Sequence, residues 1–177
     1  MFRRTNLADY YTPTVIQQAI PEADMTPLER LLLSHIFESE RDGEGWHFFS
    51  EVGPVDMTAI TGAALKAALA ASEPDLDNTA YAFARKRLAD LKDGELQDDQ
   101  LDVDFSETSW ESILQDVVRR SPTLRYVSVV SSFTCSRMRP DGFGGAVVVI
   151  VADAILGKST TDLLEEFIGR VAPSSDG

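Results

Sequence analysis

Two segments in the last third of the chain constrain the fold most strongly. Residues 124–138 alternate between apolar and polar side chains, which is typical of a half-buried β-strand. One face of this segment carries Val127, Val129, Phe133 and Cys135. Residues 146–152 are apolar on both faces, as in a central strand. Pro140-Asp141-Gly142 offers turn chemistry and Gly144-Gly145 permits a bulge, so we expect these segments to form the central hairpin of a sheet.

Capping signals predict helices around this hairpin. Thr26-Pro27-Leu28-Glu29 has the pattern of a capping box with proline at the first helical position, and Thr108-Ser109-Trp110-Glu111 is a second such box. The second helix then has an apolar stripe of Trp110, Ile113, Leu114, Val117 and Val118. Further helices are expected over residues 61–71, after Asn78 or Thr79, and after Ser159 or Thr160. In the last helix we expect an inward face of Leu163, Leu164, Phe167, Ile168 and Val171.

Short strands are expected near residues 46–49, 55–60 and 101–105. Strands joined by short turns and interleaved with helices predict an α+β fold, with a largely antiparallel sheet of about four to five strands and helices mainly on one face. We expect an N-terminal arm at residues 1–25, a single domain at 26–172 and a polar tail at 173–177.

Charged residues are unevenly distributed along the chain. Between Asp93 and Asp116 there are nine acids and no lysine or arginine. These acids are Asp93, Glu95, Asp98, Asp99, Asp102, Asp104, Glu107, Glu111 and Asp116. The next stretch, up to Pro140, has no acid and five arginines: Arg119, Arg120, Arg125, Arg137 and Arg139. Charge patterning governs steering and partner choice rather than fold, so it indicates a binding surface and names no reaction.

The composition of the 177-residue chain excludes several classes of protein. Its net charge of −13 disfavours direct nucleic-acid binding, which needs a basic surface. The single cysteine rules out an intramolecular disulfide and, with only two histidines, argues against a structural zinc site. No apolar run is long enough to span a membrane, and no signal-peptide pattern follows the start. We therefore expect a soluble cytoplasmic protein with no cofactor and no metal.

Residues 152–159 fit a loose phosphate-binding loop, because Ala152 is followed after four residues by Gly157-Lys158-Ser159. The four intervening residues contain no glycine, and Asp153 places a negative charge where phosphates would bind. Only about 20 residues follow, too few for the second, magnesium-binding strand of such enzymes. We expect Gly157 to end a turn and Ser159 to cap a helix.

Other polar groups have simpler interpretations than catalysis. Cys135 with His35 or His47 would suit a nucleophile and base, but Cys135 shares a face with apolar residues and is expected to be packing. Asp102 and Asp104 would share one face of a strand, but the surrounding spacing is not that of a calcium-binding loop. Arg137 and Arg139 flank the glycine turn, where they would bind a carboxylate or phosphate ligand or pair with the acids of residues 101–105.

Several stretches between Arg119 and Phe167 carry a resemblance. Four stretches in this region resemble small uncharacterised proteins of alphaproteobacteria, some of them on mobile elements. They are Arg120-Ser121, Leu124-Arg125-Tyr126-Val127, residues 135–145 and Gly157-Lys158-Ser159-Thr160. Residues 26–33 are similar too. The resemblance supplies no activity and no catalytic residue. It implies an accessory or anti-defence role.

These observations favour a non-enzymatic acidic protein that covers a basic surface on a protein partner. A nucleic-acid-binding protein is the natural target, and the protein would then act as a nucleic-acid mimic. The expected partner-binding residues are Asp98, Asp99, Asp102, Asp104, Glu107 and Glu111. The alternative is a small enzyme or ligand-binding domain that uses Arg137 and Arg139 of the glycine-rich hairpin. Neither hypothesis involves a membrane, and both leave a homo-oligomer open.

Overall fold

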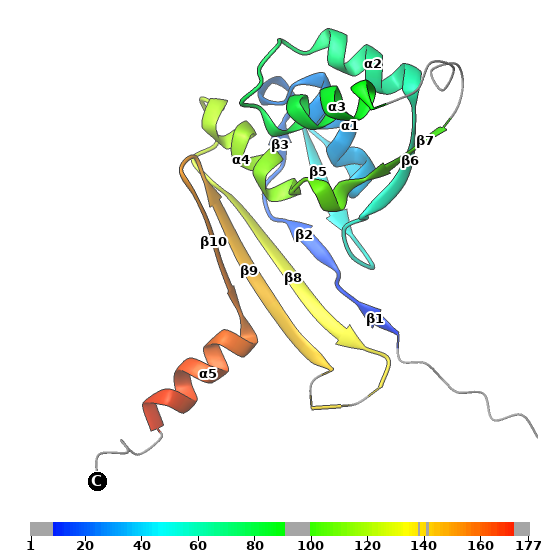
Figure 1. The fold of residues 1–177 in the computed structure, drawn as a ribbon. Helices are drawn as coiled ribbons and strands as arrows, with labels where there is room; N and C mark the ends of the chain where they lie inside the picture. Colours follow the sequence, from blue (N-terminus) through cyan, green and yellow to red (C-terminus); the bar gives the residue numbers. More distant parts are fainter. Residues whose placement is uncertain (1–8, 91–99, 138, 141, 172–177) are drawn as a thin grey trace, which may run out of the picture.

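The computed structural model describes residues 9–90, 100–137, 139–140 and 142–171. Within these residues the fold is α+β, with five α-helices, an eight-stranded sheet and a separate two-stranded sheet. Every strand pair in both sheets is antiparallel (Figure 1). The predicted fold class and the largely antiparallel sheet are confirmed.

Three consecutive strands form one half of the large sheet: β8 (Val127–Cys135), β9 (Phe143–Val151) and β10 (Ala154–Ser159). The register pairs Val127 with Ile150 and Val129 with Val148. Val127, Val129 and Ile150 are buried, and they define the inner face of the sheet. The expected central hairpin is therefore present. The third strand, β10, replaces the turn expected at residues 152–159.

The other half of the sheet contains short N-terminal strands. These are β1 (Tyr10–Tyr11), β2 (Thr14–Ile16) and β3 (Ile20–Pro21). β1 and β2 both pair with β8, and β2 and β3 both pair with β5 (Gly45–Ser50), so the three pieces form one interrupted row. β4 (Glu38–Asp42) completes the sheet on the far side of β5.

The expected count of about four to five strands is corrected to eight. The missing strands lie mainly in the segment expected to be an arm, where pieces of two or three residues are too short to show a two-residue period. They form because β8 and β5 offer backbone partners on either side, which is a tertiary effect.

Four helices pack together against one end of the large sheet. They are α1 (Pro27–Ile36), α2 (Gly62–Ala71), α3 (Thr79–Ala89) and α4 (Trp110–Arg120). The small sheet of β6 (Met57–Thr61) and β7 (Gln100–Asp104) completes this region. The turns η1 (Glu22–Asp24) and η2 (Phe105–Glu107) precede α1 and α4. The predicted capping box at Thr26 and Glu29 is confirmed, as is the burial of Ile113, Leu114 and Val117 on α4.

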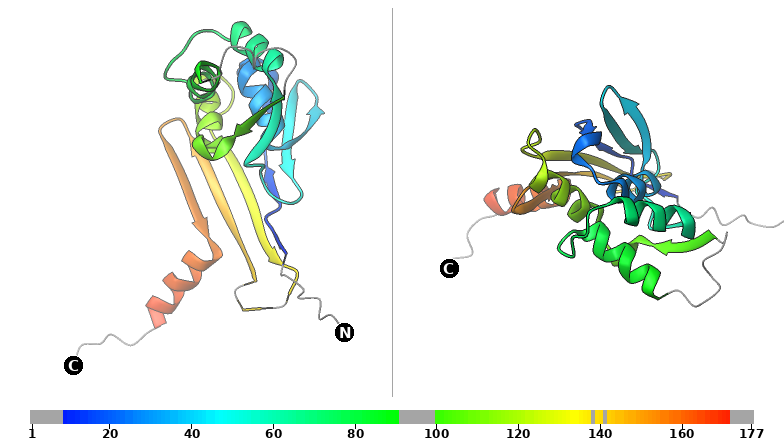
Figure 2. Two further views of the ribbon diagram at one scale, coloured as in Figure 1. Left: turned by 45° about the vertical axis from the view of Figure 1, so that its right-hand side comes forward. Right: turned by 90° about the horizontal axis from the view of Figure 1, so that it is seen from above.

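The last helix, α5 (Thr160–Val171), is present but does not pack as expected. Its predicted inward residues form an exposed apolar stripe, defined as Leu163, Leu164, Phe167, Ile168 and Val171. Figures 1 and 2 show that the β8–β9–β10 segment extends away from α1–α4 and that α5 continues from its far end. The periodicity correctly indicated an apolar face, but the face lies outside the core, since its five side chains remain exposed in the described part of the chain.

Candidate functional site

The expected acidic surface is built on β7. Leu101 and Val103 are buried, whereas Asp102 and Asp104 point to solvent. On the neighbouring strand β6, Ile60 pairs with Leu101, and Met57, which is exposed, pairs with Asp104. The alternation predicted from the sequence therefore places both carboxylates on the outer face of the small sheet.

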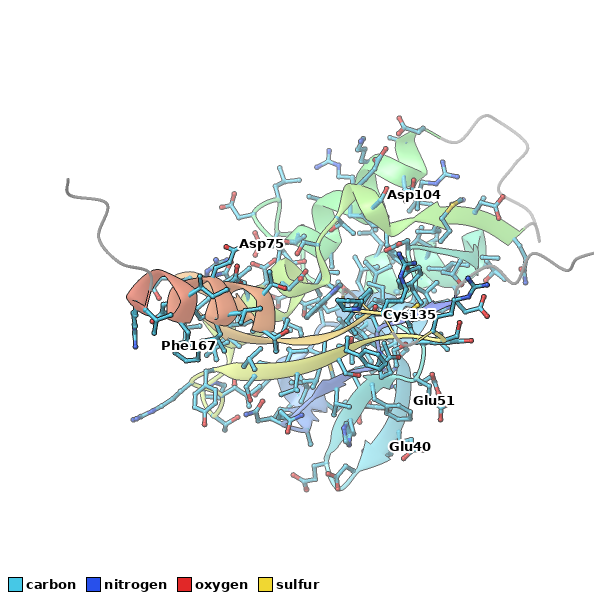
Figure 3. All side chains as sticks on the ribbon, turned by 90° about the horizontal axis from the view of Figure 1, so that it is seen from below. Glu40, Glu51, Asp75, Asp104, Cys135 and Phe167 are labelled. Atoms are coloured by element: carbon cyan, nitrogen blue, oxygen red, sulfur yellow. The ribbon has the colours of Figure 1, made fainter. Side chains whose placement is uncertain are left out.

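The acids continue along the chain into η2 and the start of α4. Glu107 is exposed at the end of η2, and Glu111 is partly exposed in the first turn of α4. We call Asp102, Asp104, Glu107 and Glu111 the acidic face. Asp98 and Asp99, also expected here, lie outside the described residues, as do Asp93 and Glu95. Figure 3 shows the Asp104 side chain at the periphery of the molecule.

Hydrogen bonds hold two of these carboxylates in place. Asp104 Oδ1 accepts a bond of 2.8 Å from the backbone N–H of Ser106 and so caps η2. The side chain of Ser106, and then its backbone N–H, lower the pKa of Asp104 from its ordinary value, because both bonds favour the charged form. Glu111 Oε2 accepts a bond of 2.6 Å from the Ser109 hydroxyl. The acidic face thus carries its charge in a defined geometry.

Basic residues of α3 border the acidic face. Lys86 Nζ lies 2.8 Å from Glu107 Oε2, and this contact raises the pKa of Lys86. Arg87 Nη2 donates to the backbone carbonyl of Asp102 at 2.9 Å. A pocket of about 210 Å³ lies between α3 and β7 and is lined by these groups. Lys86 and Arg87 neutralise part of the negative charge of the acidic face. Because the acidic face has four carboxylates, its net charge remains negative.

Asp116 was counted with the acidic stretch but has a structural role. It is buried, and its Oδ2 accepts a bond of 2.6 Å from the backbone N–H of Thr79 at the start of α3. Its Oδ1 lies 2.6 Å from Arg119 Nη1. The change of sign between residues 116 and 119 therefore reflects an ion pair within α4, whose acid also joins α4 to the start of α3 through the Thr79 N–H.

Arg137 and Arg139 follow β8 in the connection to β9, at the opposite end of the molecule from β7 (Figure 1). Arg139 Nη1 donates to the hydroxyl of Tyr10 at 3.2 Å. The pairing with Asp102 and Asp104 considered from the sequence does not match this arrangement, because β7 belongs to the other sheet.

A groove of about 610 Å³ lies near this connection. Its lining includes Ser131, Phe133, Phe143, Gly144, Ala146 and Leu164. Arg137, Arg139 and Cys135 are not among the described residues that line it. Arg137 and Arg139 lie in the connection between β8 and β9, and their use by a ligand stays a prediction.

The residues considered for nucleophilic chemistry lie in separate elements. Cys135 is buried at the end of β8, as expected of packing. His35 Nδ1 bonds to the carbonyl of Leu31 within α1, and the ring of His47 on β5 packs edge-on against Phe49. These contacts are local to each element and do not bring a base to the thiol.

The loop expected at residues 152–159 is the extended strand β10, paired with β9 along its length. Lys158 forms an ion pair with Glu166 of α5. A phosphate cradle needs backbone N–H groups that converge, and an extended paired strand directs them alternately to either side. Ser159 does act in capping, because its Oγ accepts a bond of 3.1 Å from the backbone N–H of Asp162, and the Asp162 carboxylate accepts from the Ser159 backbone N–H.

Among the described residues, no group of three or more histidine, cysteine, aspartate or glutamate side chains is arranged to hold a metal ion. In the same part of the chain, no helix combines the length and the apolar character needed to cross a membrane. Comparison with known proteins finds no matching family model, no matching curated protein and no matching solved structure.

Proposed function

We propose that this protein is a non-enzymatic acidic binding protein whose acidic face covers a basic surface on a protein partner. The observation that carries the proposal is the alternation on β7, which buries Leu101 and Val103 and leaves Asp102 and Asp104 in solvent. Exposed carboxylates on a rigid strand add little to stability. They are well placed to steer a positively charged partner and to fix its register.

A nucleic-acid-binding protein is the partner class that best fits this chemistry. Its binding groove recognises fixed, spaced negative charges, and electrostatic contacts supply much of its affinity. Carboxylates two residues apart on a strand are separated by roughly 7 Å, so Asp102 and Asp104 form a pair of such charges at a fixed spacing. In its more specific form, the proposal is that the protein occupies the binding groove of its partner in place of nucleic acid and so inhibits that partner.

The test compares two variants with equal changes of charge. In the test variant, Asp102→Asn, Asp104→Asn and Glu107→Gln neutralise the acidic face. Asparagine retains a side-chain oxygen that can cap η2. In the control, Glu40→Gln, Asp42→Asn and Glu44→Gln neutralise three exposed acids of the β4–β5 hairpin. Capture of partners from a lysate is followed by mass spectrometry at low and moderate salt.

We expect the parent and the control to retain a basic protein that the test variant loses, and we expect double-stranded DNA to release that protein. Melting temperatures of both variants should stay close to that of the parent, because relief of repulsion between like charges offsets, in the test variant, the loss of the exposed Lys86–Glu107 pair and of the charged Asp104 cap. Equal retention by all three proteins would show that the acids serve only solubility. Loss of the partner from both variants alike would show that total charge, rather than the acidic face, governs binding.

A further inference from the structure

The apolar stripe of α5 is the largest exposed apolar feature on any helix of the described structure. Its five side chains expose between 38% and 81% of their surface. On α4, a comparable set of apolar residues is buried in the core. A helix of 12 residues has little stability of its own in water, so a persistent α5 needs a surface against its apolar side.

The start of α5 is fixed to the sheet in a way that holds the stripe outward. Thr160 Oγ1 accepts a bond of 3.1 Å from the backbone N–H of Gly145 on β9. Ser159 caps the helix by accepting a bond from the backbone N–H of Asp162, and Glu166 pairs with both Lys158 and Arg170. Figure 3 shows Phe167 on α5 at one extremity of the molecule, away from Asp104, Glu40 and Glu51.

The groove is the uncovered part of the inner face of the large sheet. Strand alternation puts Ser131 and Phe133 on the same side of β8 as the buried Val127 and Val129. At the other end, α4 covers this side, where Gln115 Nε2 and Arg119 Nε donate to carbonyls at the β9–β10 turn. Beyond the reach of α4, the inner face is open as the groove.

The stripe and the groove form one continuous surface, because Leu164 belongs to both. A surface that offers an apolar projection beside an apolar recess can pair with itself about a two-fold axis. If a fully exposed large apolar side chain presents roughly 150–200 Å², the stripe offers about 500 Å². Each copy would bury both its stripe and its groove, and the stripe alone supplies more than half of the roughly 800 Å² per partner of a stable complex.

The distribution of charge also favours a second copy. Residues 127–159 have three bases and two acids, a net charge of +1, whereas α5 has three acids and one base, a net charge of −2. The whole chain has a net charge of −13, but the β8–β9–β10 segment is slightly positive, so it does not repel the negatively charged α5 of another copy. An acidic polar side also disfavours a membrane surface, since membrane-bound amphipathic helices are rich in lysine and arginine.

We propose that two copies of this chain form a two-fold symmetric dimer in which the apolar stripe of each α5 lies in the groove of the other copy. This dimer is independent of the proposed function of the acidic face. Figure 1 shows that α5 and the connection between β8 and β9 lie at the end of the molecule remote from β7, and the groove is lined by residues of this end. Both acidic faces therefore remain accessible in the dimer.

The first experiment measures the mass of the purified full chain in solution by light scattering after gel filtration. We expect twice the 19.5 kDa of one chain for the parent and a single chain for Leu164→Glu. Leu76→Glu is the matched control, because Leu76 is 64% exposed in a loop and Leu164 is 59% exposed on α5. Circular dichroism of Leu76→Glu should match that of the parent, and Leu164→Glu should lose no more helix signal than the 12 residues of α5 supply. A monomeric parent, or a dimeric Leu164→Glu, overturns the proposal.

The second experiment needs no variant. Hydrogen exchange of the parent is followed at the highest protein concentration, and the backbone amides of α5 should be strongly protected there. On dilution they should lose protection if monomer forms, while α4 should stay protected because it lies in the core. Fast exchange throughout α5 in a concentrated dimer would show that the copies associate through another surface, and the proposal would fail.

Discussion

At the scale of single residues, the most constrained group is the carboxylate of Glu29. Its side chain is fully buried, and Oε2 accepts bonds from the backbone N–H of Thr26 at 2.8 Å and from Arg120 Nη2 at 2.6 Å. Oε1 accepts a bond of 2.6 Å from Asn78 Nδ2. Asn78 caps α3 and Arg120 lies in the last turn of α4, so one acid connects α1, α3 and α4. A buried charge persists only when it is paired and hydrogen-bonded in this way.

Removal of Arg120 should therefore be costly. We expect Arg120→Ala to lower the free energy of unfolding by roughly 2–4 kcal/mol, because Glu29 would keep a buried charge without its cation. Arg125→Ala is the control, since Arg125 is exposed, and it should cost no more than about 0.5 kcal/mol. Urea unfolding of the two variants checks this. Equal losses would mean that Asn78 and Thr26 alone satisfy Glu29.

Asp104 gives a prediction for the dependence on pH. Its pKa in the folded chain lies below the ordinary value of 3.8, chiefly because of the Ser106 side chain. A lowered folded pKa means that the stabilising contribution is complete above the unfolded pKa and is lost as the pH falls through the folded value. In Ser106→Ala, the carboxyl resonance of Asp104 should titrate at a higher pH than in the parent. An unchanged midpoint in an NMR titration would assign the shift to another group.

At the scale of helices and strands, the sequence correctly predicted those features that depend on interactions between residues close together in the chain. The Thr26 capping box, the apolar residues of α4 and the alternation of β7 each describe one element and its own buried face. The acidic face was predicted for the same reason, since alternation alone places Asp102 and Asp104 together. These features need no knowledge of the neighbouring elements.

Features that depend on distant partners were not predicted. The row of β1, β2 and β3 exists because β8 and β5 accept it, and the bond between Glu29 and Arg120 joins residues far apart in the chain. β10 resembled a loop because Gly157-Lys158-Ser159 suggests a turn, whereas pairing with β9 extends it. Amphipathicity showed that α5 has an apolar side, but it carries no information about what covers that side.

The burial of α4 leads to a prediction about the core. Leu114 is fully buried, so Leu114→Ala should lower the free energy of unfolding by roughly 2–5 kcal/mol through lost burial and an internal cavity. Leu76→Ala makes the same chemical change at an exposed position and should cost less than about 0.5 kcal/mol. Thermal and urea unfolding measure both. A small loss at Leu114 would mean that α4 does not pack on the sheet as described.

At the scale of the whole molecule, the two surfaces with proposed functions lie at opposite ends and differ in character. Figure 2 shows that β6, β7 and α3 lie at the end of the ribbon far from α5. The first end presents the acidic face, and the α5 end presents apolar groups and the bases of the β8–β9–β10 segment. Attraction between opposite charges weakens as the salt concentration rises, whereas burial of apolar area does not. Ionic strength can therefore separate association through one end from association through the other.

We expect sodium chloride to affect the two associations with opposite signs. Two copies that each have a net charge of −13 repel each other, so screening of this repulsion by salt should strengthen the dimer. Salt does not weaken the burial of the apolar stripe. Capture of a basic partner by the acidic face depends on attraction, so it should weaken as the screening length falls from about 10 Å at 0.1 M salt to about 3 Å at 1 M. Sedimentation equilibrium of the parent and partner capture would be measured across one salt series. If self-association weakened together with capture, the dimer would be held by charge rather than by the apolar stripe. If capture strengthened with salt, the partner would be bound through apolar groups, and the acidic face would not be the binding surface.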